Sequence, residues 1–215
     1  MTDGASMVEN LHLLGGTLCL DFANTVGNHK SDQPSDHLAD YADLVAWSRH
    51  ANILTRREAQ QLLDQAARQR AAANNVFQRA VALREAIYSI FTAIADGASP
   101  KTADLDLLND ALARALVHSR IVSTKEGFHW DWSEESTLDR MLWRIARSAA
   151  DLLTSGDLNR VSQCGDEVCG WLFIDTSKNH SRRWCAMNDC GNRAKARRHY
   201  KRIVRIKQAA ATRKR

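Results

Sequence analysis

Apolar residues recur every three or four positions over five stretches of the chain, separated by polar or glycine-containing segments. This period places an apolar stripe along one side of an α-helix, so the pattern predicts five helices. Three of them are predicted over residues 38–51, 74–95 and 136–153. The helix over 74–95 is predicted to terminate at Gly97, because glycine adopts the positive φ of a helix C-terminus without strain.

The two remaining helices carry start signals. Thr55 and Glu58 have the spacing of a capping box, in which two side chains satisfy the free backbone N–H groups of the first turn. Ser99 and Pro100 predict an N-cap followed by proline at the first helical position. The inner face of the helix that follows Pro100 is predicted to consist of Leu105, Leu108, Leu112 and Leu116.

Two further stretches alternate with a period of two, which is typical of β-strands. Residues 11–22 predict a hairpin that turns at Gly15 and Gly16, with alternating Leu18, Leu20 and Phe22 on one face. Residues 120–132 predict a second hairpin. The predicted fold class is therefore α+β, with two hairpins, able to pair into one small sheet, packed by about five helices.

Four of the five cysteines add a different kind of element near the C-terminus. Cys164 and Cys169 form one pair with four intervening residues, and Cys185 and Cys190 form a second. Two such pairs separated by a segment of hairpin length are what a tetrahedral Zn²⁺ site requires. Four thiolates leave no open coordination position, so the predicted ion is structural, with one per chain.

Alternatives to this zinc site are a disulfide framework or unrelated buried or redox-active thiols. The N-terminus has no apolar signal segment and no stretch is long and apolar enough to span a membrane, which predicts a cytoplasmic protein, where disulfides are rare. His180 or His199 could replace one cysteine as a ligand, although four thiolates are the simpler set. Cys19, in an apolar run, is predicted to be a buried core thiol.

Charge divides the chain at the same place. Residues 156–215 contain 15 Lys and Arg against 5 Asp and Glu, whereas residues 1–155 have an excess of 5 acidic residues. The break at residues 155–157 therefore predicts a neutral-to-acidic domain over 1–155 and a cationic zinc-binding domain over 156–215. Such asymmetry suits binding to a polyanion, DNA or RNA.

The zinc-binding domain is predicted to be a treble-clef finger. Residues 170–175 form a strand after the first cysteine pair, residues 176–181 turn the chain, and a helix begins at Asn192 directly after the second pair. Ala196, Tyr200 and Ile203 are predicted to cover the zinc hairpin. The residues predicted to contact nucleic acid are Arg182, Arg183, Asn192, Arg193, Lys195, Arg197, Arg198, Lys201, Arg202 and Arg205.

The sequence Cys190-Gly191-Asn192-Arg193, with the cysteine pairs and Ser181-Arg-Arg-Trp-Cys185, resembles the bacterial CGNR zinc-finger family. Leu20-Asp-Phe-Ala-Asn-Thr25 looks like the opening signature of the ABATE domain that is usually joined to that finger. The resemblance implies a stress-responsive transcription regulator, with the finger on DNA and the N-terminal domain sensing a ligand.

Residues 1–155 show no phosphate-binding loop, nucleophile elbow or zinc-protease motif, so the chain is not expected to be an enzyme. Turn and cap chemistry is the favoured interpretation of Asp21, Asn24 and Thr25, and a ligand-binding or enzymatic site there is the alternative. RNA or a protein is the alternative partner of the finger. Because one finger makes few contacts, the N-terminal domain is predicted either to form a homodimer or to bind a small-molecule ligand.

Overall fold

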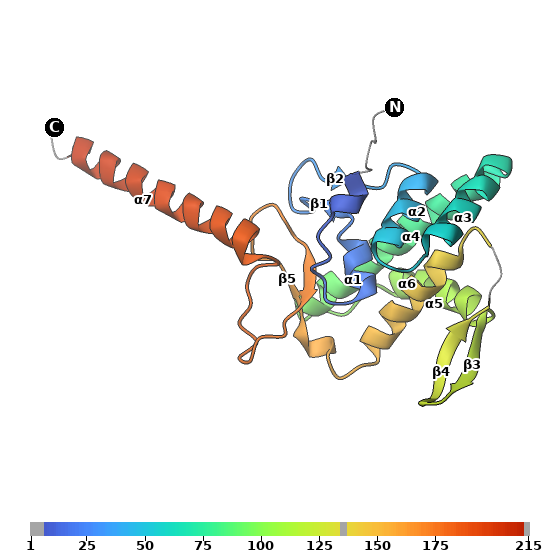
Figure 1. Ribbon diagram of the computed structural model, residues 1–215. Coiled ribbons are helices and arrows are strands. Elements are labelled where there is room, and N and C mark those ends of the chain that lie inside the picture. The colour runs from blue at the N-terminus through green and yellow to red at the C-terminus, as the bar shows by residue number, and fades with distance from the viewer. Residues whose placement is uncertain (1–6, 134–136, 213–215) are drawn as a thin grey trace.

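The computed structural model describes residues 7–133 and 137–212. A helical body is followed by a small lobe that contains four cysteines and then by a long helix that projects away from the body (Figure 1). The α-helices are α1 (Leu18–Ala23), α2 (Tyr41–His50), α3 (Arg56–Arg68), α4 (Arg70–Ala95), α5 (Thr102–Leu116), α6 (Arg140–Leu153) and α7 (Asn192–Thr212). In the part of the chain described, none of these helices is both long and apolar enough to cross a membrane.

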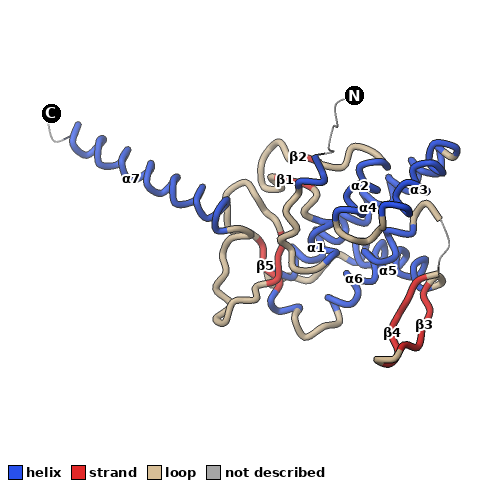
Figure 2. Tube along the Cα trace, viewed as in Figure 1, coloured by secondary structure: helices blue, strands red, loops and turns tan. Residues whose placement is uncertain are grey.

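The strands form three separate two-stranded antiparallel sheets (Figure 2). Their members are β1 (Val26–Gly27) with β2 (Ser35–Asp36), β3 (Ser119–Thr124) with β4 (Gly127–Trp132), and β5 (Val161–Gln163) with β6 (Leu172–Ile174). Single helical turns are η1 (Met7–Asn10), η2 (Leu158–Arg160) and the π-helical η3 (Met187–Gly191). The segment from η2 to η3, residues 158–191, is called the cysteine lobe below.

The five predicted helices of the body are present as α2 to α6. The capping box at α3 is confirmed: the Thr55 hydroxyl accepts from the Glu58 amide at 3.2 Å, and the Glu58 carboxylate accepts from the Thr55 amide at 2.7 Å. The α4 helix ends before Gly97, which has φ of +71° as predicted. The predicted start of the last helix at residue 136 lies outside the described residues, and α6 is described from Arg140.

The prediction of a hairpin over residues 11–22 is wrong, because residues 18–23 form the short helix α1. Cys19, Leu20, Phe22 and Ala23 are all buried, and Leu18 and Asp21 are partly buried, so most of this run packs against neighbouring elements. Period-two spacing cannot distinguish a strand from a helix when nearly every position is apolar. Tertiary contacts with α4 and α6 therefore decide its conformation.

Two details of α5 also differ from the sequence prediction. Ser99 is not the N-cap: the helix begins at Thr102, and the preceding residue Lys101 makes no side-chain cap. Leu116 is 43% exposed, and Ala115 is fully buried instead. Leu108 is buried and Leu105 packs against the core as predicted, so the difference lies at the C-terminal end of the predicted face.

The hairpin predicted at residues 120–132 is confirmed as β3 and β4, with Ile121 opposite Trp130. Within the described residues it does not join a larger sheet, so the pairing of hairpins that the sequence allowed does not occur. The hairpin projects from the body as an arm (Figure 1), and the side chains of Ile121, Phe128 and Trp130 are exposed. Its contacts with α6 include Trp132, whose ring lies 6.0 Å from that of Trp143, and Trp130, whose ring lies 5.0 Å from the Arg147 guanidinium.

A buried arginine links the start of the chain to the longest helix. Arg84 of α4 is 2% exposed and donates to both carboxylate oxygens of Asp36 at 2.8 and 2.7 Å. It also donates to the Thr25 hydroxyl at 3.3 Å and pairs with Glu85 at 3.0 Å. These bonds satisfy a charge that would otherwise be costly to bury, and they hold the β1–β2 segment against α4.

Candidate metal centre and nucleic-acid interface

Four buried cysteines converge in the cysteine lobe. Cys164 and Cys169 lie in the tight connection between β5 and β6, Cys185 follows a loop, and Cys190 lies in η3 immediately before α7. The four Sγ atoms all lie within 4.8 Å of one another. The lobe thus brings together residues that are up to 26 positions apart, as the cysteine spacing predicted.

The distances between the sulfur atoms fit a tetrahedral zinc ion. Zn–S bonds of about 2.3 Å place neighbouring sulfur atoms about 3.8 Å apart. The Cys169–Cys185 and Cys185–Cys190 Sγ distances are 3.7 and 3.4 Å, and none of the five cysteines of the chain forms a disulfide. His180 and His199 do not belong to the cluster. The four cysteines therefore form an all-thiolate zinc site, and the ion has a structural role.

The thiols of this cluster influence one another's ionisation. Hydrogen bonds with Cys169 and Cys185 lower the pKa of the Cys164 thiol. Hydrogen bonds with Cys164 and Cys169, followed by burial, raise the pKa of the Cys185 thiol, and burial raises that of Cys190. Coordination by zinc requires all four as thiolates, so metal binding must release protons from this cluster.

The strand predicted over residues 170–175 is confirmed as β6, but its partner is β5, which precedes the first cysteine pair. Among the described residues, the segment between Ile174 and Cys185 contains no strand. The first cysteine pair is consequently the tip of the β5–β6 hairpin, where the Cys164 amide donates to the Trp171 carbonyl at 2.8 Å. The loop of residues 175–184 then returns the chain to the second pair.

A buried carboxylate that the sequence analysis did not single out connects the first cysteine pair with α7. The side chain of Asp166 is fully buried, accepts from the Val168 amide at 3.1 Å and pairs with Arg197 and with Arg193. Burial opposes its ionisation, but the Arg197 and Val168 hydrogen bonds and the two arginine charges outweigh it and lower the pKa of Asp166. Two acidic residues, Asp166 and Glu167, lie between the cysteines of the first pair, and they were the available signal that the arginines of α7 have partners there.

The face of α7 that packs on the lobe is not the predicted one. Ala196 is exposed, Tyr200 is 69% exposed and Ile203 is 36% exposed, so the prediction that they cover the zinc hairpin is wrong. Ala194 is buried in their place, and Arg197 one turn later bonds Asp166. Ion pairs with Asp166 hold this face of α7 against the lobe. Apolar periodicity alone therefore could not identify the packing face.

The predicted nucleic-acid contacts fall into two groups. Several of these side chains have partners within the lobe: Arg193 donates to the Cys190 sulfur at 3.0 Å, Lys201 pairs with Glu167 at 3.3 Å, and the Asn192 amide donates to the Asn188 carbonyl at 3.1 Å. Arg183 lies over the Trp184 ring, 5.0 Å from its centroid.

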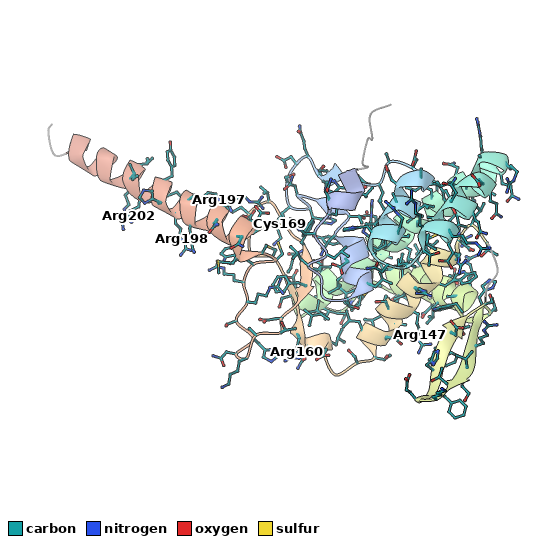
Figure 3. The ribbon with its side chains drawn as sticks, in the orientation of Figure 1. Arg147, Arg160, Cys169, Arg197, Arg198 and Arg202 are labelled. Carbon is teal, nitrogen blue, oxygen red and sulfur yellow. The ribbon has the colours of Figure 1, made fainter. Side chains whose placement is uncertain are left out.

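Four cations on α7 are exposed and have no ion-pair partner among the residues that the structure describes. They are spaced at i, i+3, i+7 and i+10, which places them on one side of an α-helix. This group, called the cationic stripe below, consists of Lys195, Arg198, Arg202 and Arg205. Arg198 and Arg202 are labelled on the projecting part of the helix in Figure 3.

Arg182, also predicted to contact nucleic acid, is bound within the lobe. Its guanidinium donates to the carbonyl oxygens of Ile174, Trp184 and Cys185 and lies over the Phe173 ring, 4.3 Å from the centroid. These contacts join β6 to the segment that carries the second cysteine pair. The role that its position supports is therefore to shape the metal site.

The predicted ligand residues of the body lie where the body meets the cysteine lobe. The Asn24 side chain donates to the Leu172 carbonyl at 2.8 Å and accepts from the Leu172 amide at 2.9 Å. The Trp171 indole donates to the Val26 carbonyl at 2.8 Å, and the Ile174 amide donates to the Gly15 carbonyl at 2.9 Å. The segment from Gly15 to Val26 is thus hydrogen-bonded to residues 171–174 of the lobe.

Asp21 and Thr25 have partners nearby. The Asp21 carboxylate accepts from the Gly15 amide at 2.7 Å, and burial raises its pKa to about 6. The Thr25 hydroxyl donates to the Phe22 carbonyl at 2.8 Å and accepts from Arg84. These are the turn and cap contacts that the sequence favoured, and the Asn24 bridge to the lobe is the feature that a single sequence did not reveal.

Two protein-family models match the chain. A family model named ABATE, described as "Putative stress-induced transcription regulator", matches residues 16–156. A model described as CGNR zinc finger matches residues 160–203, which include all four cysteines and most of the cationic stripe. No curated protein matches the chain. The first description names a regulator of transcription and no enzymatic activity.

Proposed function

Because the chain belongs to the ABATE family and continues into a CGNR zinc finger, we propose that it is a zinc-dependent DNA-binding regulator of transcription. Residues 1–155 form its regulatory domain, and residues 156–215 form its DNA-binding domain. The observation that carries the proposal is the cationic stripe, which projects from the lobe with no partner of its own among the described residues. Basic side chains aligned in this way neutralise phosphates along a duplex.

The form of α7 favours DNA over double-stranded RNA. The stripe extends over about 15 Å, given a rise of about 1.5 Å per residue. A single projecting helix of this kind fits the major groove of B-DNA, whereas the major groove of A-form RNA is too deep and narrow. Arg193, Arg197 and Lys201, which bond within the lobe, would orient the helix, and the cationic stripe would meet the phosphates.

Contacts between the two domains support a role for the body in setting the direction of α7. Leu172 and Ile174 on one face of β6 pack against the core of the body, whereas Trp171 and Phe173 on the other face pack around the cysteines. A change in the body that moves β6 would therefore move the metal site and the helix that follows it.

The proposal is tested by titrating the full-length, zinc-loaded protein with fluorescent duplex DNA at several salt concentrations. A variant that replaces Lys195, Arg198, Arg202 and Arg205 with Gln should bind roughly 10²–10³-fold more weakly at physiological salt. It should also have a shallower salt dependence, by about three to four in the slope of log K against log salt.

The matched control replaces four exposed cations of the body, Arg56, Arg57, Arg68 and Lys101, with Gln, which changes the net charge by the same amount. This control should retain nearly all affinity if the stripe itself contacts DNA. Equal losses of DNA affinity in both variants would mean that binding depends on net charge and not on the cationic stripe. Tighter binding to hairpin RNA than to duplex DNA, in the same assay, would favour the alternative of an RNA-binding finger.

A further inference from the structure

Exposed apolar side chains are concentrated on the arm formed by β3 and β4 (Figure 1). Phe128 is 80% exposed and Trp130 is 52% exposed, and Ile121 is exposed beside them. The register sets Ile121 opposite Trp130 and Ser123 opposite Phe128, so the three apolar side chains lie on one face of the arm. A contiguous apolar patch of this kind marks an interaction surface, whereas single exposed apolar residues do not.

The outer edge of β4 is open to another strand. In the part of the chain described, β4 pairs with β3 along one edge and the sheet has no third strand. A two-stranded hairpin is only marginally stable by itself, and free strand edges are usually protected by a proline, a bulge or several charged side chains. Residues 127–132 contain no proline, their pairing with β3 has no bulge, and Asp131 is their one acidic residue.

The sequence of β4 is complementary to itself in the antiparallel direction. When Trp130 lies opposite Trp130 of a second copy, Phe128 lies opposite Trp132 and His129 lies opposite Asp131. One face of the combined sheet then has aromatic pairs, and the other sets an imidazole N–H donor opposite a carboxylate. Aromatic pairs and pairs of complementary polarity are the cross-strand contacts that stabilise antiparallel sheets.

We propose that the protein forms a symmetric dimer in which β4 pairs with β4 of a second copy, so that the two arms become one four-stranded antiparallel sheet. A two-fold interface requires a surface that is complementary to itself, and β4 supplies one. Pairing through β3 would instead set Arg120 opposite the apolar Val122 and would leave the aromatic residues of β4 at the outer edges. The interface is small, so the dissociation constant is on the order of micromolar. This inference does not depend on DNA binding.

Sedimentation equilibrium of the full-length, zinc-loaded protein tests the dimer, over concentrations from micromolar to submillimolar. The mass should rise from 24.1 kDa towards twice that value. Trp130→Lys places two ammonium groups at the two-fold axis and should weaken association roughly 10²-fold. The matched control, Ile121→Lys, makes the same change on the same face but on the outer strand, and should retain the dimer.

The polar face is tested separately. His129→Asp sets two carboxylates against each other at two symmetry-related positions and should weaken association by about three- to tenfold. The melting temperature of each variant should stay close to that of the unmodified protein, because the substituted side chains are exposed on the arm. A mass of 24.1 kDa for the unmodified protein at every concentration would overturn the dimer.

A single added cysteine tests the register. Opposite residues of antiparallel strands have Cα atoms about 4.5–5.5 Å apart, which a disulfide can bridge. Trp130→Cys should therefore yield a covalent dimer under mild oxidation with zinc retained, and neither Ile121→Cys nor the unmodified protein should do so. A covalent dimer with Ile121→Cys alone, or equal loss of association in Trp130→Lys and Ile121→Lys, would overturn the assignment of the interface to β4.

Discussion

The helical body and the cysteine lobe are stabilised in different ways. The body has one continuous core that includes Phe22, Trp47 and Phe91, all with no exposed surface. In the described part of the lobe, Phe173 is the one fully buried aromatic side chain beside the four cysteines. A segment this small buries too little apolar surface to fold unaided. We therefore expect the lobe to require its metal, whereas the body has a core of its own that Val161 and Leu172 of the lobe extend.

Among the predicted changes in stability, the largest is expected when one zinc ligand is removed. Cys190→Ser should abolish zinc binding and unfold the lobe together with the first turns of α7, because the binding energy of a structural zinc, about 10–16 kcal/mol, is folding energy. The body should retain its helical content and its melting transition. Elemental analysis with circular dichroism measures both. Cys19→Ala, at the buried cysteine outside the cluster, is the control and should keep one zinc per chain.

A smaller effect is expected at the junction of the two regions. Asn24→Ala removes both hydrogen bonds to Leu172 and leaves the amide and carbonyl of a buried residue without partners. This should cost about 2–4 kcal/mol in the free energy of unfolding. Hydrogen exchange should increase first in β6 and the cysteine lobe, with zinc retained. An increase confined to the body would contradict the view that Asn24 joins the two regions.

The smallest effect concerns the ion pair within the body. Asp36→Asn weakens the partner of buried Arg84 and should cost about 1–2 kcal/mol, since Asp36 itself is half exposed. Burial opposes the charged carboxylate, but hydrogen bonds from Arg84 lower the pKa of Asp36 below its ordinary value of 3.8. Its contribution is therefore complete above that value and is lost as the pH falls below it.

The measurement that checks this pH dependence is the free energy of unfolding of the body between about pH 6 and pH 3. The unmodified protein should lose the Asp36 contribution at the acidic end, and Asp36→Asn should show a correspondingly flatter profile. Parallel profiles for the two proteins would mean that this ion pair does not couple stability to pH.

Much of this molecule could be predicted because the relevant information is local. The α3 capping box depends on two residues three positions apart, and the helices α2 to α6 follow from apolar periodicity. The zinc site follows from the cysteine spacing, because thiolates have few other roles at such density. The β3–β4 hairpin follows from alternation on both sides of a glycine-containing turn.

The errors arise where long-range contacts decide between locally acceptable conformations. Residues 18–23 are apolar at almost every position, so burial between α4 and α6 selects a helix there. The packing face of α7 is set by Asp166, which lies 31 positions from Arg197. A hydrophobic pattern carries no information about that ion pair. The sequence analysis therefore assigned the apolar residues Tyr200 and Ile203 to the packing face of α7.

The family, the zinc ligands, the helical composition of the body and the cationic character of the C-terminal region could all be inferred from the amino-acid sequence. Each of these properties depends on residue type and on spacing over a few positions. Three other properties are visible only in the folded molecule: Asn24 bonds the backbone of Leu172, Arg182 bonds the backbone beside the second cysteine pair, and the cationic stripe has no ion-pair partner among the described residues. These properties depend on which distant side chains meet, and that is determined by how the helices and the cysteine lobe pack together.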